Sequence, residues 1–320
     1  MATNDTNPRR IDVHHHVLPP TYKTRARAQL AAGTSASDDL SFLFDWTPEA
    51  ALAEMDKHGI ATAIGSISTP GVWFGDQASG RSLARECNEY MAEMGRKHPG
   101  RFGFFAAVPL PDEEGSLSEI AYALDTLMAD GVGILTSYGD KWPGDPAFAR
   151  IFDELNRRKA VVFVHPTAPS CCVGLIPGVH MAITEFVFDT TRAITSFLVN
   201  GTFQRCPDIR FIFCHAGGTM MPIAYRVAGW ASRTIAAQVP KGVLYELQRL
   251  YYDIAGAANP ASIAAVRAIV PLTQLLFGTD NPYVPIAATA MGTDKFGFTP
   301  EEARAINRDN ALRLFPRLGA

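Results

Sequence analysis

The chain alternates between short apolar runs, rich in β-branched and aromatic residues, and longer segments with apolar residues at helical spacing. The short runs predict eight strands, at residues 10–16, 61–68, 102–108, 132–137, 161–165, 210–215, 250–255 and 274–278. The longer segments predict helices at 48–58, 84–98, 117–129, 146–158, 189–200, 220–237, 260–269 and 300–314. The helices at 48 and 300 begin with Thr-Pro-Glu, which supplies a threonine N-cap and a proline at the first helical position. Residues 17–45 and 166–187 are expected to be long loops that follow strands.

Eight strands that alternate with helices indicate a parallel sheet, and eight is the number that closes a (β/α)8 barrel of the TIM type. The sequence contains no internal repeat and no low-complexity linker, so we expect residues 1–320 to form one α/β barrel domain. Active sites of such barrels lie at the rim formed by the C-terminal ends of the strands. The two long loops would supply lids and substrate contacts at this rim.

The amino-acid composition limits the classes of protein to which this chain can belong. Hydrophobic residues make up 47% of the 320 residues and charged residues 19%, which suits a compact enzyme with a large core. The net charge of −3 gives no support for binding to nucleic acid or to a membrane surface. No segment approaches the ~18 consecutive apolar residues of a membrane span, and residues 1–10 lack a signal-peptide core. Five cysteines without a scaffold pattern indicate a reducing compartment, so we expect a cytoplasmic protein.

Three consecutive histidines end the first predicted strand. Side chains alternate between the two faces of a strand, so His14 and His16 share one face and His15 takes the other. Two imidazoles one pleat apart can bind a single metal ion. The alternative is a polar, tag-like terminus, but Ile11 and Val13 precede the run and further apolar residues follow it.

Further polar residues stand at the ends of later strands. His165 ends the fifth predicted strand, His215 ends the sixth, and Asp280 follows the eighth. Taken singly, a histidine before proline usually belongs to a turn or the core, and an aspartate in Gly-Thr-Asp-Asn-Pro usually caps a turn. Together with His14 and His16 they occupy four strand ends, which a barrel brings to one rim. The joint arrangement predicts a single site.

Several stretches resemble the amidohydrolase superfamily, including "IDVHHHVLPP", "VVFVHP", "EFVFDTTRA", "FIFCHAGG" and "LLFGTDNPY". The resemblance is strongest to its decarboxylase branch, which includes aminocarboxymuconate-semialdehyde, gamma-resorcylate and methylsalicylate decarboxylases. Binuclear members of the superfamily carry a bridging lysine at the end of strand four, whereas residues 131–138 contain no lysine. The resemblance therefore implies one divalent ion per subunit. Its ligands would be His14, His16, His165 and Asp280, with zinc as the first choice and manganese as the alternative.

The resemblance also implies an activity, the nonoxidative decarboxylation of a small aromatic (hydroxybenzoate-like) or unsaturated carboxylic acid. The substrate would chelate the metal, and Asp280 or His215 would deliver a proton to the carbon that loses carbon dioxide. Sequence leaves open which of the two does so. The alternative activity at the same site is metal-dependent hydrolysis of a lactone, amide or C–C bond, or hydration of a dicarboxylic acid. A non-enzymatic metal-binding or scaffold protein is a third hypothesis.

An acidic substrate needs a cation to orient it. Arg226 lies eleven residues after His215, well along a predicted helix and therefore awkwardly placed to reach its own rim. The resemblance implies that this arginine reaches the site of a neighbouring subunit, so we expect a homodimer. The alternative is an ordinary arginine on the surface of a helix.

Aromatic residues on or near the rim loops are further candidates for substrate binding. Trp46, Trp73, Phe74 and Tyr283 could enclose an aromatic ring, although aromatic residues on loops often only cover the core. His180, in the loop 166–187, could contact the substrate, and the alternative is an ordinary loop histidine.

Overall fold

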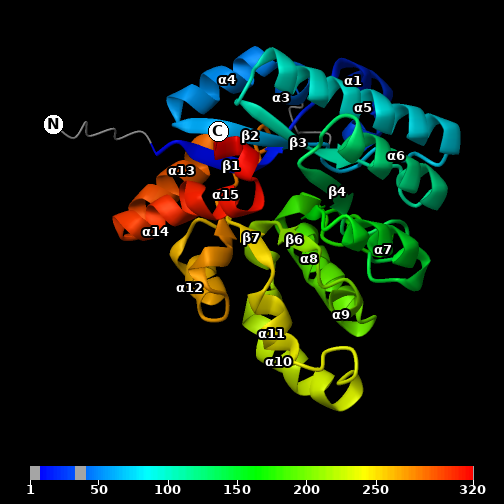
Figure 1. The fold of residues 1–320 in the computed structure, drawn as a ribbon, viewed down its shortest axis with the longest axis vertical. Helices are drawn as coiled ribbons and strands as arrows, with labels where there is room; N and C mark the ends of the chain where they lie inside the picture. Colours follow the sequence, from blue (N-terminus) through cyan, green and yellow to red (C-terminus); the bar gives the residue numbers. More distant parts are fainter. Residues whose placement is uncertain (1–7, 33–40, 320) are drawn as a thin grey trace.

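The computed structural model describes residues 8–32 and 41–319, and its centre is a sheet of eight parallel strands in the order β1 to β8 (Figure 1). Each strand pairs with the next one along the chain. The strands are β1 (Arg10–His16), β2 (Ile60–Ser66), β3 (Phe102–Ala107), β4 (Gly131–Leu135), β5 (Val161–His165), β6 (Arg210–Phe213), β7 (Tyr251–Asp253) and β8 (Leu275–Leu276). The architecture is the (β/α)8 barrel that the sequence predicts.

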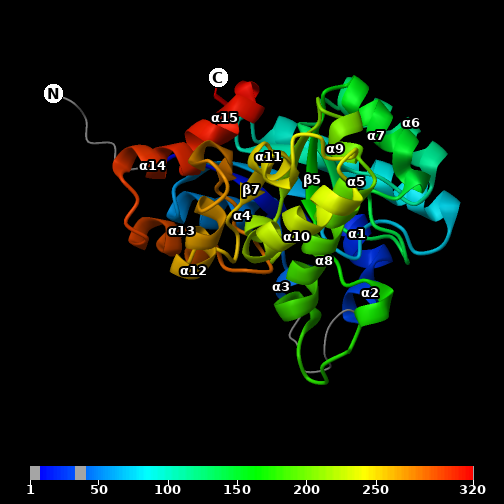
Figure 2. The same ribbon diagram turned by 90° about the horizontal axis from the view of Figure 1, so that it is seen from below.

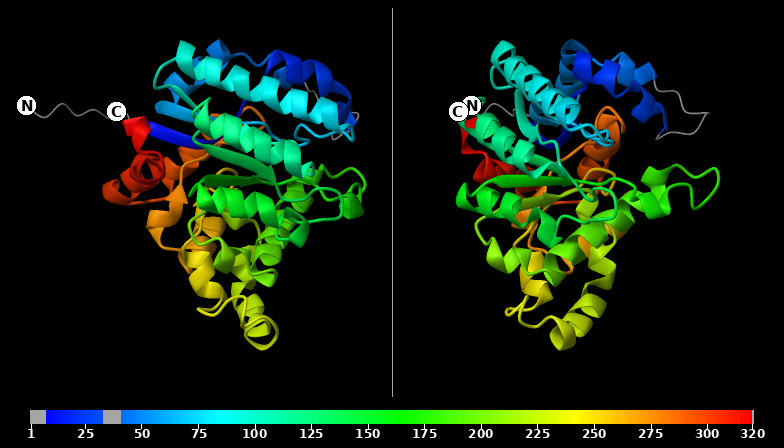
Figure 3. Two further views of the ribbon diagram at one scale, coloured as in Figure 1. Left: turned by 45° about the vertical axis from the view of Figure 1, so that its right-hand side comes forward. Right: turned by 90° about the vertical axis from the view of Figure 1, so that its right-hand side faces the viewer.

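Helices follow the strands and surround the sheet (Figure 1, Figure 3). They are α1 (Pro20–Arg25), α2 (Arg27–Ala32), α3 (Ser41–Phe44), α4 (Pro48–Lys57), α5 (Gln77–Lys97), α6 (Glu113–Asp125), α7 (Ala149–Arg157), α8 (Met181–Val199), α9 (Thr202–Arg205), α10 (Met220–Thr234), α11 (Val243–Gln248), α12 (Pro260–Arg267), α13 (Ile286–Lys295), α14 (Pro300–Arg304) and α15 (Asn310–Leu314). In the part of the chain that the structure describes, no helix is both long and apolar enough to span a membrane.

The barrel closes between its first strand and the residues that follow its last one. Asp12 is fully buried on β1 and makes the side-chain contacts of this seam. Its carboxylate accepts hydrogen bonds from the backbone nitrogen and the hydroxyl of Thr279, at 3.0 and 2.6 Å. Backbone bonds from Val13 to Phe277 (3.0 Å) and from Asp280 to His14 (2.7 Å) continue the seam. The seam therefore ties residues from the two ends of the sequence together.

The interior of the barrel is filled by large apolar side chains. Phe105 and Phe163 stack with their ring centroids 4.9 Å apart, and His14 packs edge-on against Phe163 at 5.1 Å. Phe315, just after α15, packs against Phe105 from the C-terminal segment. These aromatic rings pack directly beneath His14 and support it from the interior of the barrel.

The structure corrects several predicted boundaries. The described part of the expected loop 17–45 forms the short helices α1, α2 and α3, while residues 33–40 lie outside the described residues. The expected loop 166–187 ends early, because the His180 side chain accepts a hydrogen bond from the nitrogen of Ala182 and caps α8. The helix expected from residue 84 begins at Gln77, because Asp76 caps it in the same way. A π-helical turn, Ala305–Asp309, interrupts the helix expected at 300–314.

Two glycines of β4 allow a test of how closely the strands are packed. A Cβ on Gly131 would lie 2.4 Å from the carbonyl oxygen of Val161, whereas a Cβ on Gly133 would meet nothing closer than 3.6 Å. We predict that Gly131→Ala destabilises the fold by about 1–3 kcal/mol, because the backbone of β5 must move. Gly133→Ala is the matched control and should leave the urea midpoint nearly unchanged. Equal midpoints for the two variants would contradict this account of the packing.

Candidate metal centre and active site

Four side chains from distant parts of the chain converge at the rim of the barrel. His14 and His16 end β1, His165 ends β5, and Asp280 follows β8. One ligand atom from each lies within 4.8 Å of those of the others. The Nε2 atoms of His14 and His16 are 3.1 Å apart, and the Asp280 Oδ1 atom is 3.3 and 3.0 Å from them. The arrangement is a compact group of nitrogen and oxygen donors.

Alternation along β1 separates the three neighbouring histidines. His14 and His16 both turn to the cluster, and their rings lie 5.2 and 4.7 Å from the ring of His165. His15 is fully buried elsewhere, with its Nδ1 atom 3.0 Å from Asp12 Oδ2. His15 is therefore part of the seam that closes the barrel and lies outside the donor cluster.

Hydrogen bonds behind the rings orient the cluster. His14 Nδ1 lies 3.0 Å from Asp253 Oδ2, and His16 Nδ1 lies 3.0 Å from the hydroxyl of Ser66. When a ring nitrogen donates to such a partner, the other nitrogen keeps its lone pair for a metal. Asp253 also accepts from the backbone nitrogens of His215 and Ala255, at 3.1 and 3.0 Å. Sequence reasoning missed Asp253, whose only signal is an aspartate inside the seventh predicted strand.

The imidazoles and carboxylates of the cluster shift one another's pKa values. Burial lowers the pKa of His165 well below its ordinary value, and the nearby His16 and His14 lower it further. Burial alone would raise the pKa of Asp280, but the contacts with His14 and His16 hold it well below its usual range. Burial opposes a proton on His14, yet Cys214, Asp253 and Asp280 together raise the pKa of this residue well above its ordinary value. The carboxylates thus stay ionised and draw positive charge into the cluster.

The residues fit one divalent cation. The buried Nδ1 atom of His165 has no hydrogen-bond partner among the residues that the structure describes, and the Nε2 atoms of His14 and His16 face each other at 3.1 Å. Three imidazoles and one carboxylate are a donor set typical of divalent first-row metal ions. A second group, His14, Cys214 and Asp253, shares His14 with the first. The two groups cannot both use the same His14 nitrogen, and burial raises the pKa of the Cys214 thiol, so the first group is the better fit for one ion.

His215 lies beside the cluster with one ring nitrogen fixed and the other facing the site. Its Nδ1 atom donates to the carbonyl oxygen of Ala255 at 2.8 Å, so Nε2 carries the lone pair. Nε2 is 3.9 Å from Asp280 Oδ2, the carboxylate oxygen on the far side from the contacts with His14 and His16. Both His215 and Asp280 have positive φ angles, 55° and 65°. Non-glycine residues persist in this region only where surrounding structure holds them, which is common at functional sites.

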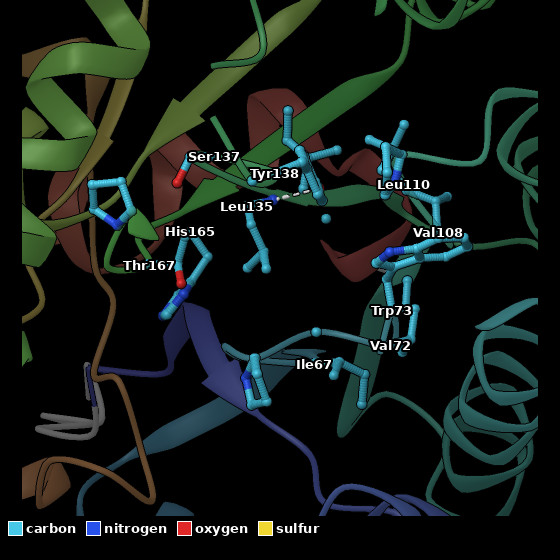
Figure 4. Close-up of a pocket in the computed structure, with 18 of the residues that line it drawn as sticks. Ile67, Val72, Trp73, Val108, Leu110, Leu135, Ser137, Tyr138, His165 and Thr167 are labelled. Carbon is cyan, nitrogen blue, oxygen red and sulfur yellow. Dashed lines mark hydrogen bonds between the residues drawn. The ribbon is translucent and has the colours of Figure 1, made fainter. Parts of the chain in front are cut away.

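A pocket of about 470 Å³ adjoins the cluster at His165. Figure 4 shows His165 and Thr167 on one side of it and Trp73, Val108 and Leu110 on the other. The remaining walls come mainly from apolar residues that follow β2, β3 and β4, among them Ile67, Val72, Leu135 and Tyr138. The lining given by the described residues contains no lysine, arginine, aspartate or glutamate. The pocket therefore suits a flat apolar ring with one polar end toward His165.

The predicted aromatic contacts divide between the pocket, the cluster and the core. Trp73 lines the pocket, and Tyr283 packs edge-on against the ring of His16 at 5.3 Å. Phe74 lies next to Trp73 but packs against the core beside α5 rather than lining the pocket. Trp46 is buried among core residues such as Tyr22 of α1, because the segment expected as an open loop folds into helices there.

The two predicted polar contacts lie on the surface of this chain. His180 is exposed and caps α8, and it does not line the pocket. Arg226 is exposed on α10, and no hydrogen bond or ion pair joins its side chain to another residue that the structure describes. Neither side chain completes the pocket within the described residues of a single chain.

The geometry of β1 predicts different outcomes for its neighbouring histidines. His16→Ala removes a donor from the cluster, so we expect the purified protein to lose its metal. His15→Ala should keep the metal, but it should lower the free energy of unfolding by about 1–3 kcal/mol because Asp12 loses a buried partner. Elemental analysis and urea unfolding of both variants make the comparison. An empty site in His15→Ala beside a filled one in His16→Ala would contradict the strand register.

Similar folds occur among solved structures. A 2,6-dihydroxybenzoate decarboxylase solved with 2,6-dihydroxybenzoate superposes with a TM-score of 0.83 at 20% identity, covering 96% of this chain and 99% of that one. A manganese-bound 5-carboxyvanillate decarboxylase from Novosphingobium aromaticivorans gives 0.87 at 20% identity, covering 96% of each chain. At this level of identity the likeness concerns the fold.

Sequence similarity is higher among curated proteins. The decarboxylase yanB of Aspergillus niger is 36% identical, covering 96% of this chain and 88% of that protein. A 6-methylsalicylic acid decarboxylase of Penicillium expansum is 34% identical, covering 97% of each. A family model described as amidohydrolase matches residues 11–317. The chain therefore belongs to the amidohydrolase family.

Proposed function

We propose that this protein catalyses the nonoxidative decarboxylation of a small hydroxybenzoate-like acid. The observation that carries the proposal is the position of the donor cluster, which meets an apolar, ring-sized pocket at His165. The relatives with 33–36% identity are named as decarboxylases, and two of them as 6-methylsalicylic acid decarboxylases. A salicylate with a methyl substituent matches a pocket that offers apolar walls and hydroxyl groups but no second cation. 6-Methylsalicylate is therefore the first substrate to test.

One divalent ion per subunit is the proposed cofactor, with His14, His16, His165 and Asp280 as its ligands. Zinc is the first choice because three imidazoles dominate the donor set, and manganese is the alternative. When bound, such an ion would polarise the oxygen atoms of the substrate. The chain itself holds the ligands in place through Asp253 and Ser66.

His215 and Asp280 are the residues that we propose to hold and deliver the proton. Decarboxylation breaks a carbon–carbon bond, releases carbon dioxide and leaves an electron pair on a ring carbon, which must receive one proton. His215 Nε2 and Asp280 Oδ2 face each other across 3.9 Å at the edge of the cluster. A substrate whose carboxyl end passes His165 and reaches the cluster would approach both groups, so either could supply the proton. The apolar walls exclude water and favour the conversion of a carboxylate into neutral carbon dioxide.

The proposed partner is a second copy of the chain, with Arg226 acting across the interface. Beside Arg226 on α10, Tyr225 and Trp230 are 70% and 41% exposed, and Ile183 on α8 is 69% exposed. Helices α8 and α10 lie next to each other (Figure 2). Exposed aromatic and aliphatic side chains around an arginine are typical of a protein interface. An incoming guanidinium would supply the carboxylate partner that the pocket lacks.

Turnover should depend on His215 independently of metal binding. With 6-methylsalicylate, we predict that the metal-loaded protein releases one carbon dioxide per substrate consumed. His215→Ala should keep its metal and lose turnover by ~10²-fold or more, because the proton carrier is gone. His58→Ala, at the end of α4 and away from the site, is the control. Substrate consumption without carbon dioxide would favour the hydrolase or hydratase alternative.

Subunit mixing tests the role of Arg226. Arg226→Ala and His215→Ala should each be nearly inactive alone. A mixed dimer combines His215 of one chain with Arg226 of the other, so up to one working site per heterodimer should return. Tagged chains and size-exclusion chromatography establish that exchange has occurred. If exchange takes place and no activity returns, Arg226 does not act across the interface.

A further inference from the structure

Two adjacent cysteines lie in the segment between β5 and α8, which projects past α2 and α3 (Figure 2, Figure 3). Cys171 and Cys172 belong to the 3₁₀ turn Ser170–Cys172, and their Sγ atoms are 2.7 Å apart. Cys171 is exposed, whereas Cys172 is buried. The remaining cysteines, Cys87, Cys206 and Cys214, are buried and stand alone in the sequence. The adjacent pair is therefore the one place where a reagent from solvent meets two thiols together.

The turn forms part of the wall of the substrate pocket. Pro169 and Ser170 line the pocket on one side of the cysteines, and Val173 lines it on the other. Few hydrogen bonds hold this wall: Cys172 donates its backbone N–H to the carbonyl of Pro169 at 2.9 Å, and the Ser170 hydroxyl reaches the carbonyl of Gly139 at 3.5 Å. A change in the backbone between the two cysteines must therefore displace residues that line the pocket.

Joining neighbouring cysteines imposes such a change. Consecutive Cα atoms lie ~3.8 Å apart across a trans peptide, which is less than the 4.4–6.8 Å that disulfides usually span. A disulfide between neighbours is consequently strained and easily reduced.

The two thiols also differ in their surroundings. The hydrogen bond with Cys171 raises the pKa of Cys172, an effect that Arg192 opposes. Because Cys171 is exposed and Cys172 is buried, Cys171 is the sulfur that a reagent reaches first.

We propose that Cys171 and Cys172 form a dithiol modification site. At this site a peroxide produces a reversible disulfide, which reshapes the wall of the pocket. The Cys171 sulfur attacks one peroxide oxygen, becoming a sulfenic acid as the O–O bond breaks and one water leaves. The Cys172 sulfur then displaces the hydroxyl group as a second water, and the S–S bond forms. Two electrons pass from the sulfurs to the peroxide, and both thiol hydrogens end in water. In the reducing compartment expected for this protein, the dithiol is the resting form.

The thiol chemistry can be measured without any assay of turnover. Phenylarsine oxide bridges two thiols with loss of one water, and intact-mass spectrometry counts the adducts. We expect the metal-loaded protein and Cys206→Ser to take up one arsenical per chain, and Cys171→Ser and Cys172→Ser to take up none. Limited hydrogen peroxide should remove two hydrogen atoms from the peptide that contains both cysteines, and dithiothreitol should restore them. Uptake that is absent in the native protein, or unchanged in either serine variant, would overturn the site.

The effect on the pocket rests on the proposed function and is measured separately. Peroxide treatment should raise the KM for 6-methylsalicylate by about fivefold or more, because displaced wall residues misplace the ring. Dithiothreitol should reverse the change, and Cys171→Ser/Cys172→Ser should not respond to peroxide. Disulfide formation with an unchanged KM would overturn the coupling to the pocket. A protein that forms the disulfide but never releases carbon dioxide would instead contradict the proposed function and leave the dithiol site established by mass.

Discussion

The site depends on the hydrogen bonds of Asp12, a carboxylate buried completely at the seam of the barrel. β8 has only two residues, so backbone pairing alone gives little support on that side. Asp12 accepts bonds from His14, His15 and Thr279 and so locks the first strand to the segment that carries Asp280. A buried carboxylate is stable only when its oxygens accept hydrogen bonds, and these bonds hold the seam in the arrangement that the structure shows. That arrangement places Asp280 against His14 and His16.

A second buried carboxylate, Asp253, fixes the positions of His14 and His215 in the same way. It faces His14 Nδ1 with one oxygen and accepts the backbone N–H of His215 with the other. One side chain thus holds both the ring of the proposed metal ligand His14 and the backbone of the proposed proton carrier His215. Both contacts favour the ionised form, and they lower the pKa of Asp253 although burial alone would raise it. The contacts that keep Asp253 ionised are therefore also the contacts that hold His14 and His215 in position.

The donor cluster is polar and the pocket beside it is apolar, and this difference explains how the site can be selective for its ligand. Phe163 closes the floor below His14, while Trp73, Val108 and Leu110 form the far side of the pocket. A ring in this pocket would meet mainly apolar side chains, together with a few hydroxyl groups and the imidazole of His165. The walls come from strands β3, β4 and β5 and from the segments that follow β2 to β5, whereas the seam joins β1 to the residues after β8. The cysteine pair lies on the segment after β5, between residues that line the pocket.

The sequence by itself determined the strands, their alternation with helices and the polar residues at the strand ends, because these follow from local periodicity. Alternation along residues 10–16 was enough to separate His15 from His14 and His16. Only the tertiary structure decided which distant groups meet. Asp253 contacts His14 across 239 positions, and nothing near Asp253 in the sequence signals that contact. Trp46 and Trp73 look alike as loop aromatics, yet one is buried in the core and the other lines the pocket. Local spacing specifies the face that a side chain occupies, whereas closing the barrel decides what lies opposite it.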